Sequence, residues 1–202
     1  MNLNFEKARN LMVENQLRPS NINDSRILNL FRNIKKEDFL LDKDKSISYH
    51  DSDINIIENR GYLKNLNLAQ LITNAKINKS DLILHLGGLT GYVSVILAQL
   101  SKKIIVLENE KGLIDIINKN IKQLEIDNIE VIESIFSNGY DKLSPYDLIF
   151  IDNPIDKIPD SIKEQLSSNY GKIIMLKKTN NFFSQVYKIT RINNDFTEEF
   201  LF

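Results

Sequence analysis

Short apolar segments alternate with helical segments from residue 65 onward, and this pattern constrains the fold more than any other feature of the chain. The apolar segments are nearly continuous, which is typical of strands buried on both faces. Strands of this kind that alternate with helices form a mostly parallel sheet covered on both faces. The sequence therefore predicts an α/β fold. The expected strands are Leu82–Leu86, Ile104–Glu108, Ile129–Glu133, Leu148–Asp152 and Lys172–Leu176, and the expected helices are Asn65–Ala75, Gly91–Lys102, Glu110–Leu124 and Asp160–Ser168.

The two ends of the chain follow other patterns. Near the C-terminal end, Phe182–Ile192 and Asp195–Phe202 have strand-like composition with no helix between them, which predicts an antiparallel hairpin at one edge of the sheet. Near the N-terminal end, Phe5–Leu17 carries apolar residues at helical spacing. A second helix is expected after Asp24, which is a suitable N-cap.

The remaining N-terminal residues are expected to be irregular. Arg18-Pro19-Ser20 should end the first helix, because proline disfavours helical backbone in the residue before it. Lys43–Glu58 is polar and reads as a long surface loop. Since no obvious linker divides the 202 residues, we expect one domain, with a helical extension and loop over residues 1–60 and an α/β core over residues 61–202.

A glycine-rich turn, residues 87–91, joins the first core strand to the helix that follows it. Glycines let the backbone turn tightly and approach a ligand closely, and the amides at a helix start suit an anionic or acceptor group. Glu108 ends the next strand about 20 residues further on, where nucleotide-binding folds place an acid on the ribose hydroxyls. The right-handed crossover brings these two strand ends together. The pattern predicts a nucleotide-type cofactor crevice; a plain turn beside an exposed carboxylate is the alternative.

Composition excludes several classes of function. The 26 Lys and Arg nearly balance the 27 Asp and Glu, so nothing favours nucleic acid or an anionic membrane as a partner. Lys35–Lys36 reads as solvated surface. The absence of cysteine rules out disulfides, thiolate metal sites and cysteine nucleophiles, and no metal site is predicted. The start, Met1–Asn10, is polar, and no apolar run approaches the roughly 20 residues that span a bilayer, so we expect a cytoplasmic protein.

Motif matches to one known family run in order over almost the whole chain. The most specific are Gln16-Leu17-Arg18 and Pro145-Tyr146-Asp147, and the core match is Gly87–Tyr92 with Glu108. Further matching stretches are Met12–Ser20, Arg26–Leu28, Glu37–Phe39, Tyr49–Asp51, Ile158-Pro159 and Gln165-Leu166 leading to Gly171. Together these stretches resemble the protein-L-isoaspartate O-methyltransferase family.

The resemblance implies a Rossmann-like methyltransferase fold with S-adenosylmethionine as cofactor. It puts Gly87, Gly91 and Tyr92 near the methionine part of the cofactor and Glu108 on its ribose. The family's reaction is methyl transfer to the abnormal side-chain carboxylate of isoaspartate in damaged proteins. A carboxylate with a pKa of roughly 4 is already ionised at neutral pH, so catalysis is mainly positioning and no catalytic residue is assigned. The candidate cofactor contacts are His85, Gly87, Gly88, Gly91, Tyr92, Glu108, Asn109 and Ile135.

The chain departs from the family pattern around the cofactor. The family has an acid where this chain has His85, and a neutral imidazole cannot balance the cofactor's ammonium group as a carboxylate would. A packed strand-end histidine is the alternative. The family has a glycine where this chain has Leu89; if that backbone takes a positive φ, leucine costs about 1–2 kcal/mol. Ile135 replaces an acid expected near the adenine, while Gly139 is retained.

The chain also departs at the substrate site that the resemblance implies. The family carries a Thr-x-Ser-x-Pro stretch there, and those positions fall on Gly61, Leu63 and Asn65, so both hydroxyls and the proline are absent. A pocket that lost these donors would bind a carboxylate less well. The expected partner is an isoaspartyl protein or peptide, or a small molecule. Two alternatives are a non-catalytic binding or scaffold protein with this fold, and an amino-group methyltransferase indicated by Asp152-Asn153-Pro154-Ile155.

Overall fold

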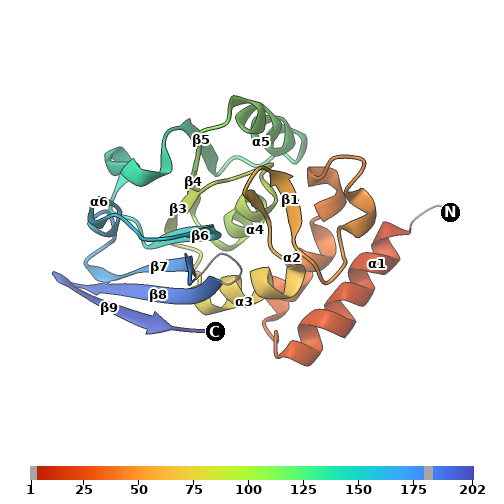
Figure 1. The fold of residues 1–202 in the computed structure, drawn as a ribbon, viewed down its shortest axis with the longest axis horizontal. Coiled ribbons are helices and arrows are strands. Elements are labelled where there is room, and N and C mark those ends of the chain that lie inside the picture. Colours follow the sequence, from red (N-terminus) through yellow and green to blue (C-terminus); the bar gives the residue numbers. More distant parts are fainter. Residues whose placement is uncertain (1–3, 180–183) are drawn as a thin grey trace. The chain divides into compact units, whose positions relative to one another are not determined.

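The computed structural model describes residues 4–179 and 184–202, and the chain divides into two compact units, Met1–Thr73 and Asn74–Phe202. The boundary falls within helix α3, Asn65–Ala75, whose bounds are those expected from the sequence. The fold is drawn in Figure 1, and each unit is described below by itself.

The first unit is mostly helical. Helix α1 (Phe5–Met12) continues without a break into a π-helical segment, Val13–Leu17, so the helix expected over residues 5–17 is present. Helix α2 (Ser25–Asn33) begins at Asp24, whose carboxylate accepts a hydrogen bond from the Arg26 amide at 2.8 Å. The N-cap expected from the sequence is therefore confirmed.

Helical backbone extends through residues 18–20, where Pro19 was expected to end the first helix. Arg18–Ser20 forms a 3-10 turn, and the left-handed residue that ends it is Asn21, with a φ of 64°. Proline is tolerated there because Pro19 lies in the first turn of that segment, where its missing amide removes no hydrogen bond.

The interpretation of residues 43–58 as a polar loop was wrong for its second half. Strand β1 (Ile54–Ile57) pairs antiparallel with β2 (Arg60–Tyr62) through a turn at Asn59, whose φ is 61°. Ile54 is buried, and its partner in the ladder is Tyr62, also buried. Average polarity hid this hairpin, because only the inward residues of a short strand need to be apolar. Two 3-10 turns, Lys36–Phe39 and Lys45–Ile47, precede it.

The second unit is built on a seven-stranded sheet with the strand order β5-β4-β3-β6-β7-β8-β9. Pairing from β5 to β7 is parallel, whereas β8 pairs antiparallel with both β7 and β9. Figure 1 shows β7, β8 and β9 side by side in blue. The mostly parallel sheet with an antiparallel C-terminal hairpin is thereby confirmed; the expected start of that hairpin at residues 182–183 lies outside the described residues. The strands are β3 (Leu82–Leu86), β4 (Lys103–Glu108), β5 (Ile129–Glu133), β6 (Leu148–Ile155), β7 (Asn169–Lys178), β8 (Ser184–Ile192) and β9 (Asp195–Phe200).

Three helices of this unit follow strands of the parallel part of the sheet. They are α4 (Tyr92–Leu100), α5 (Lys111–Gln123) and α6 (Asp160–Lys163). Every residue of α4 except Gln99 is buried, whereas α5 buries only Leu113 and Ile117. The helix α4 is therefore a core element, and α5 is amphipathic with a broad solvent face.

Helix α6 is shorter than the Asp160–Ser168 expected from the sequence. The chain after it pairs with the segment that leads into β6: the Tyr146 amide donates to the Gln165 carbonyl, and the Ser167 amide donates to the Tyr146 carbonyl, both at 2.8 Å. These backbone groups are used between segments, so they cannot continue the helix.

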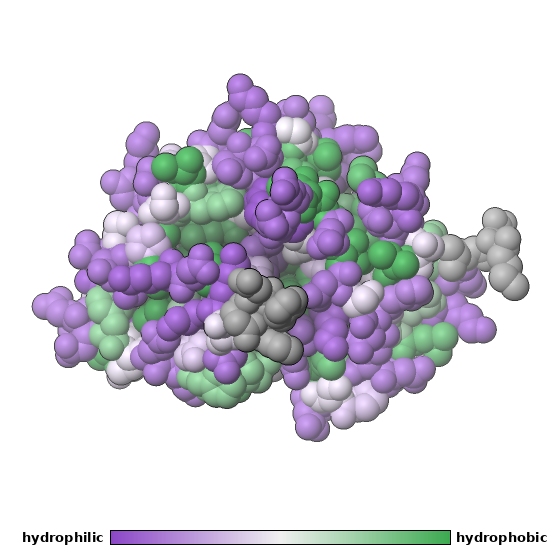
Figure 2. Space-filling view, in the orientation of Figure 1, coloured by the Kyte–Doolittle hydropathy of each residue, from purple (hydrophilic) through white to green (hydrophobic). Residues whose placement is uncertain are grey.

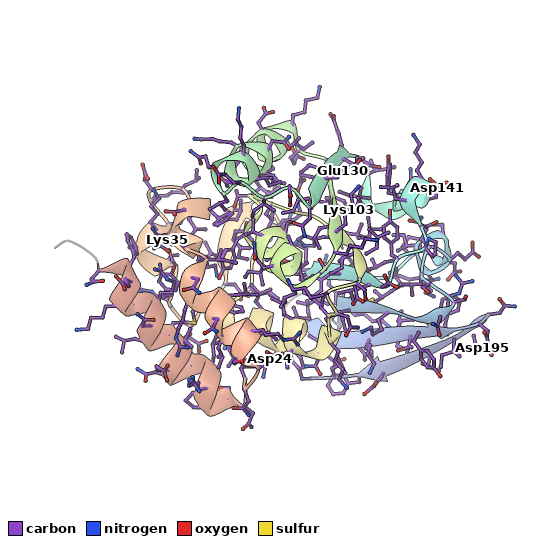
Figure 3. All side chains as sticks on the ribbon, turned by 180° about the vertical axis from the view of Figure 1, so that it is seen from behind. Asp24, Lys35, Lys103, Glu130, Asp141 and Asp195 are labelled. Carbon is purple, nitrogen blue, oxygen red and sulfur yellow. The ribbon has the colours of Figure 1, made fainter. Side chains whose placement is uncertain are left out.

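Alternate residues of adjacent strands form the core on one face of the sheet, as the period of a strand requires. Leu84 and Leu86 lie there with the corresponding residues of β4, β6 and β7, and Ile158, Ile162 and Leu166 pack over them. At the sheet edge, Lys103 of β4 and Glu130 of β5 form an ion pair with 2.7 Å between Nζ and Oε2 (Figure 3).

The surface is ordinary for a globular protein. In Figure 2 hydrophilic residues cover most of the visible face, with hydrophobic residues showing between them. Within residues 4–179 and 184–202, no helix has both the length and the apolar character required to cross a membrane.

Candidate functional site

The glycine turn lies between β3 and α4 and has the backbone that glycine favours. Gly87 has a φ of 86° and Gly91 a φ of 98°, both in the left-handed region. The Gly87 amide donates to the Leu107 carbonyl at 2.9 Å, and this bond joins the turn to the end of β4. The predicted meeting of the two strand ends is therefore present in the structure.

Gly88 has a different reason to be glycine. A Cβ at this position would lie 2.4 Å from Val106 Cγ1 and 3.0 Å from Ile117 Cδ1. Real side-chain carbons do not approach that closely, so the turn packs directly on β4 and α5. The residue was predicted as a cofactor contact, and the contacts that explain it are packing contacts within the protein.

Glu108 is fully buried at the end of β4. Its Oε2 accepts a hydrogen bond from the Leu89 amide at 3.1 Å, and its Oε1 accepts from the amides of Asn109 at 2.9 Å and Glu110 at 3.2 Å. The glycine turn and the start of the following loop thus hold the carboxylate in one orientation.

Leu89 has the positive φ that is unfavourable for a residue other than glycine. Its φ is 52°, so the left-handed backbone is occupied by a side-chain-bearing residue at a cost of about 1–2 kcal/mol. The side chain is fully buried, and its amide contacts Glu108. Tyr92, the first residue of α4, is buried as well.

The other two predicted contacts lie at exposed positions near the same strand ends. The Ser134 amide donates to the Glu108 carbonyl at 3.1 Å, which brings the chain after β5 beside the end of β4. Ile135 follows directly and is 57% exposed, an unusual state for a large apolar side chain. Asn109 is also exposed.

His85 is packed inside the protein at the end of β3. It is fully buried, its ring meets Phe150 edge-on at 5.9 Å, and its two ring nitrogens each have a partner. Nδ1 lies 2.9 Å from the Ser94 hydroxyl, and Nε2 lies 3.1 Å from Asp152 Oδ1. Sequence reasoning did not connect Asp152 with His85. The signal was its position on β6, two residues after Phe150, which is the partner of His85 on the neighbouring strand β3.

The first unit contains a buried lysine that the sequence reading assigned to the surface. Lys36 is fully buried, and its Nζ donates to the Leu63 carbonyl at 3.3 Å and to Asn65 Oδ1 at 3.0 Å. Burial lowers the pKa of Lys36 to about 7, against the opposing attraction of Asp53. Leu63 and Asn65 are two of the expected substrate-site positions. At the third, a Cβ on Gly61 would lie 2.3 Å from the Ile54 carbonyl oxygen.

The two family-specific motifs make structural contacts. Asp147 Oδ2 accepts from the Leu82 amide at 2.8 Å, and the Tyr146 hydroxyl donates to the Tyr140 carbonyl at 2.5 Å. In the first unit, Gln16 Nε2 donates to the Tyr49 carbonyl at 3.0 Å. Within the described part of the chain, no group of three or more His, Cys, Asp or Glu side chains could hold a metal ion.

The sheet order, the glycine turn after β3 and the acid at the end of the neighbouring strand β4 define the class of proteins with a Rossmann-like methyltransferase fold. Residues 7–199 match the family model described as protein-L-isoaspartate(D-aspartate) O-methyltransferase. The chain belongs to this family, whose cofactor is S-adenosylmethionine.

Individual relatives agree with this assignment. A protein-L-isoaspartate O-methyltransferase from Brucella anthropi is 30% identical over 172 residues, which cover 85% of this chain and 78% of the relative. A solved protein-L-isoaspartate O-methyltransferase superposes with a TM-score of 0.81 at 19% identity, covering 97% of this chain and 62% of its own. A Plasmodium falciparum chain of the same name, in complex with S-adenosyl-L-homocysteine, has a TM-score of 0.79 at 22% identity, covering 99% and 95%.

Proposed function

We propose that this chain transfers the methyl group of S-adenosylmethionine to a side-chain carboxylate, with an isoaspartyl residue of a protein or peptide as the substrate. The observation that carries the proposal is the Glu108 carboxylate, which backbone amides of the glycine turn and the next loop hold at the carboxyl end of β4. An acid there suits the two hydroxyls of a ribose. The Glu108 carboxylate, which accepts hydrogen bonds, therefore fits the hydroxyls of the nucleoside part of the cofactor.

The remaining roles follow from backbone and exposure. The positive-φ glycines Gly87 and Gly91 keep the turn free of side chains where the methionine part would lie, with Tyr92 and His85 behind it. The exposed side chain of Ile135 offers an apolar surface to the adenine ring, and Asn109 lies beside the ribose-binding acid. Gly88 supports these positions through packing.

The methyl transfer requires little from the protein except that the two reactants are held in position. When bound, S-adenosylmethionine supplies a methyl group on a good sulfonium leaving group. A substrate carboxylate is ionised at neutral pH and needs no general base. The protein's own residues therefore act by holding the two reactants in line and excluding water, and we assign no catalytic residue.

One observation favours a second candidate, a binding or scaffold protein without catalytic activity. Leu89 is fully buried and its backbone is bonded to Glu108, so the position that the family keeps as glycine is filled by a side chain. The absence of hydroxyls at positions 61 and 63 also argues against binding of an isoaspartyl substrate. It is compatible with a diverged substrate, including a small molecule.

A thermal-shift titration followed by a methyl-transfer assay separates the two. Ligand at 100 times its dissociation constant adds roughly 2.7 kcal/mol of stability, so S-adenosylmethionine and S-adenosylhomocysteine should both raise the melting temperature. An isoaspartyl peptide should then accept labelled methyl in a base-labile product, and the matched aspartyl peptide should not. Binding without transfer favours the scaffold role, and a base-stable product favours an amine substrate. A melting temperature that does not change at millimolar ligand would contradict the proposed methyltransferase function.

We also infer the domain organisation of the chain and its place of action. The chain forms one methyltransferase-like domain in which residues 1–60 are an extension of an α/β core over residues 61–202. Its place of action is the cytoplasm, which the cysteine-free composition supports.

A further inference from the structure

A buried chain of three polar side chains, Ser94, His85 and Asp152, lies beside the glycine turn. His85 of β3 pairs with Phe150 of β6, and Asp152 follows two residues later on the same face of the sheet. The Ser94 hydroxyl reaches the ring from α4 at 2.9 Å, and Asp152 Oδ1 reaches it from β6 at 3.1 Å. All three side chains are almost fully buried.

The hydrogen-bond chemistry fixes the direction of this chain. An ionised carboxylate only accepts hydrogen bonds, so His85 Nε2 carries a proton and donates it to Asp152 Oδ1. In the neutral imidazole Nδ1 then accepts from the Ser94 hydroxyl. Asn153 Nδ2 also donates to Oδ1, at 3.3 Å. Among the described residues, every recorded hydrogen bond of this carboxylate uses Oδ1, which leaves Oδ2 for a ligand.

The same three residue types form nucleophilic triads in hydrolases, but this set cannot work in that way. Ser94 lies in the first turn of α4 with a fully buried side chain, so no substrate carbonyl can reach its hydroxyl. Its hydroxyl serves to hold the His85 ring. At the other end of the set, the Oδ2 atom of Asp152 takes no recorded hydrogen bond from the described residues, so the set offers a ligand this one acceptor.

This inference rests on the proposed function. We propose that Asp152 supplies the acid that is missing at position 85 and binds the ammonium group of S-adenosylmethionine through Oδ2, with His85 as its positioning residue. The cofactor carries one cationic amino group at its methionine end, and a carboxylate binds such a group through a charge-assisted hydrogen bond. Strand β6 pairs in parallel with β3 up to Phe150 and His85, so Asp152, two residues beyond Phe150, lies at the carboxyl end of β3.

Two ligands separate the ammonium contact from the rest of the site. S-adenosylhomocysteine carries the amino-acid part, whereas 5′-methylthioadenosine has the same nucleoside and sulfur without it. Asp152→Asn should weaken binding of S-adenosylhomocysteine about 10- to 100-fold in calorimetry and leave binding of methylthioadenosine unchanged. The control Asp156→Asn removes the same charge from an exposed position and should change neither affinity. Asp152→Ser replaces the asparagine variant if circular dichroism shows that the latter does not fold.

Moving the acid tests the assignment further. The double variant His85→Glu with Asp152→Asn should recover affinity for S-adenosylhomocysteine to within a few-fold of wild type. His85→Leu should weaken only that ligand, and His85→Gln, which keeps a donor for Asp152, should restore part of the loss. Equal losses for both ligands in D152N, or no loss for either, would overturn the inference. Wild-type protein that binds neither ligand would overturn the proposed function itself.

Discussion

Lys36 allows the pH dependence of stability to be worked out from one buried group. Its pKa falls from 10.5 to about 7 in the folded protein, because burial disfavours the charged form. Between these values the unfolded chain keeps the proton that the folded chain has released, so stability rises with pH. The slope is about 1.4 kcal/mol per pH unit, and integration from pH 7 to pH 9, allowing for half-protonation at the start, gives about 2 kcal/mol.

The test compares wild type with Lys36→Met, which keeps the length of the side chain but cannot titrate. Urea unfolding at pH 7, 8 and 9 gives the free energy of unfolding of each protein. The difference between wild type and variant should grow by about 2 kcal/mol in favour of wild type from pH 7 to pH 9. The difference in free energy of unfolding at a single pH is not the test, because the variant also removes the hydrogen-bond donor of the Leu63 carbonyl and Asn65, which destabilises it at every pH. Lys35→Met changes the exposed neighbouring lysine labelled in Figure 3, and its free energy of unfolding should depend on pH as that of wild type does. Parallel pH profiles for Lys36→Met and wild type would refute the reasoning.

Other changes test the cofactor loop and its surroundings. Leu89→Gly relieves a backbone with a φ of 52° but deletes a fully buried side chain, so it should lower stability by about 1–3 kcal/mol while tightening S-adenosylhomocysteine binding in calorimetry; weaker binding would contradict this. Ile135→Asp, at a position 57% exposed, should change stability by less than about 0.5 kcal/mol and strengthen binding several-fold if an acid contacts the adenine. Gly139→Ala should cost about 2–4 kcal/mol in chemical denaturation, because φ is 61° and a Cβ would lie 2.4 Å from Gln165 Oε1. Gly112→Ala on α5 meets no atom within 4 Å and should be neutral or stabilising.

Periodicity was enough to predict the regular part of the fold. Strands β3 and β5 and helix α3 have the expected bounds, because each combines a clear apolar pattern with a clear boundary. The β1–β2 hairpin was missed because a strand of four residues has too few inward positions to show a period. Helix α6 ends early for a tertiary reason, the pairing of its following residues with Tyr146, which no local pattern reports.

Features of the candidate site that depend on one segment of the chain could be predicted from the sequence. Contacts between two segments could not. The positive φ at Gly87 and Gly91 and the position of Glu108 follow from a single turn and a single strand. At Gly88 a close approach to side chains of β4 and α5 also requires glycine, and sequence alone does not separate this requirement from a ligand contact. The contact of His85 with Asp152 depends on β3 and β6 being neighbours, although β4 and β5 come between them in the sequence.

The departures from the family pattern have a different meaning once their spatial partners are known. Taken singly, the loss of an acid at His85 and of hydroxyls near Leu63 argues for a decayed site. In the structure, each lies against a buried charged or ionisable group: Asp152 contacts His85, and Lys36 contacts Leu63 and Asn65. Burying such groups costs free energy unless they are well paired, and stability alone is served equally well by apolar side chains of similar size. Within each unit taken by itself, their presence therefore favours rearrangement over decay, and in the second unit the acid proposed at Asp152 is the change that ligand binding can measure directly.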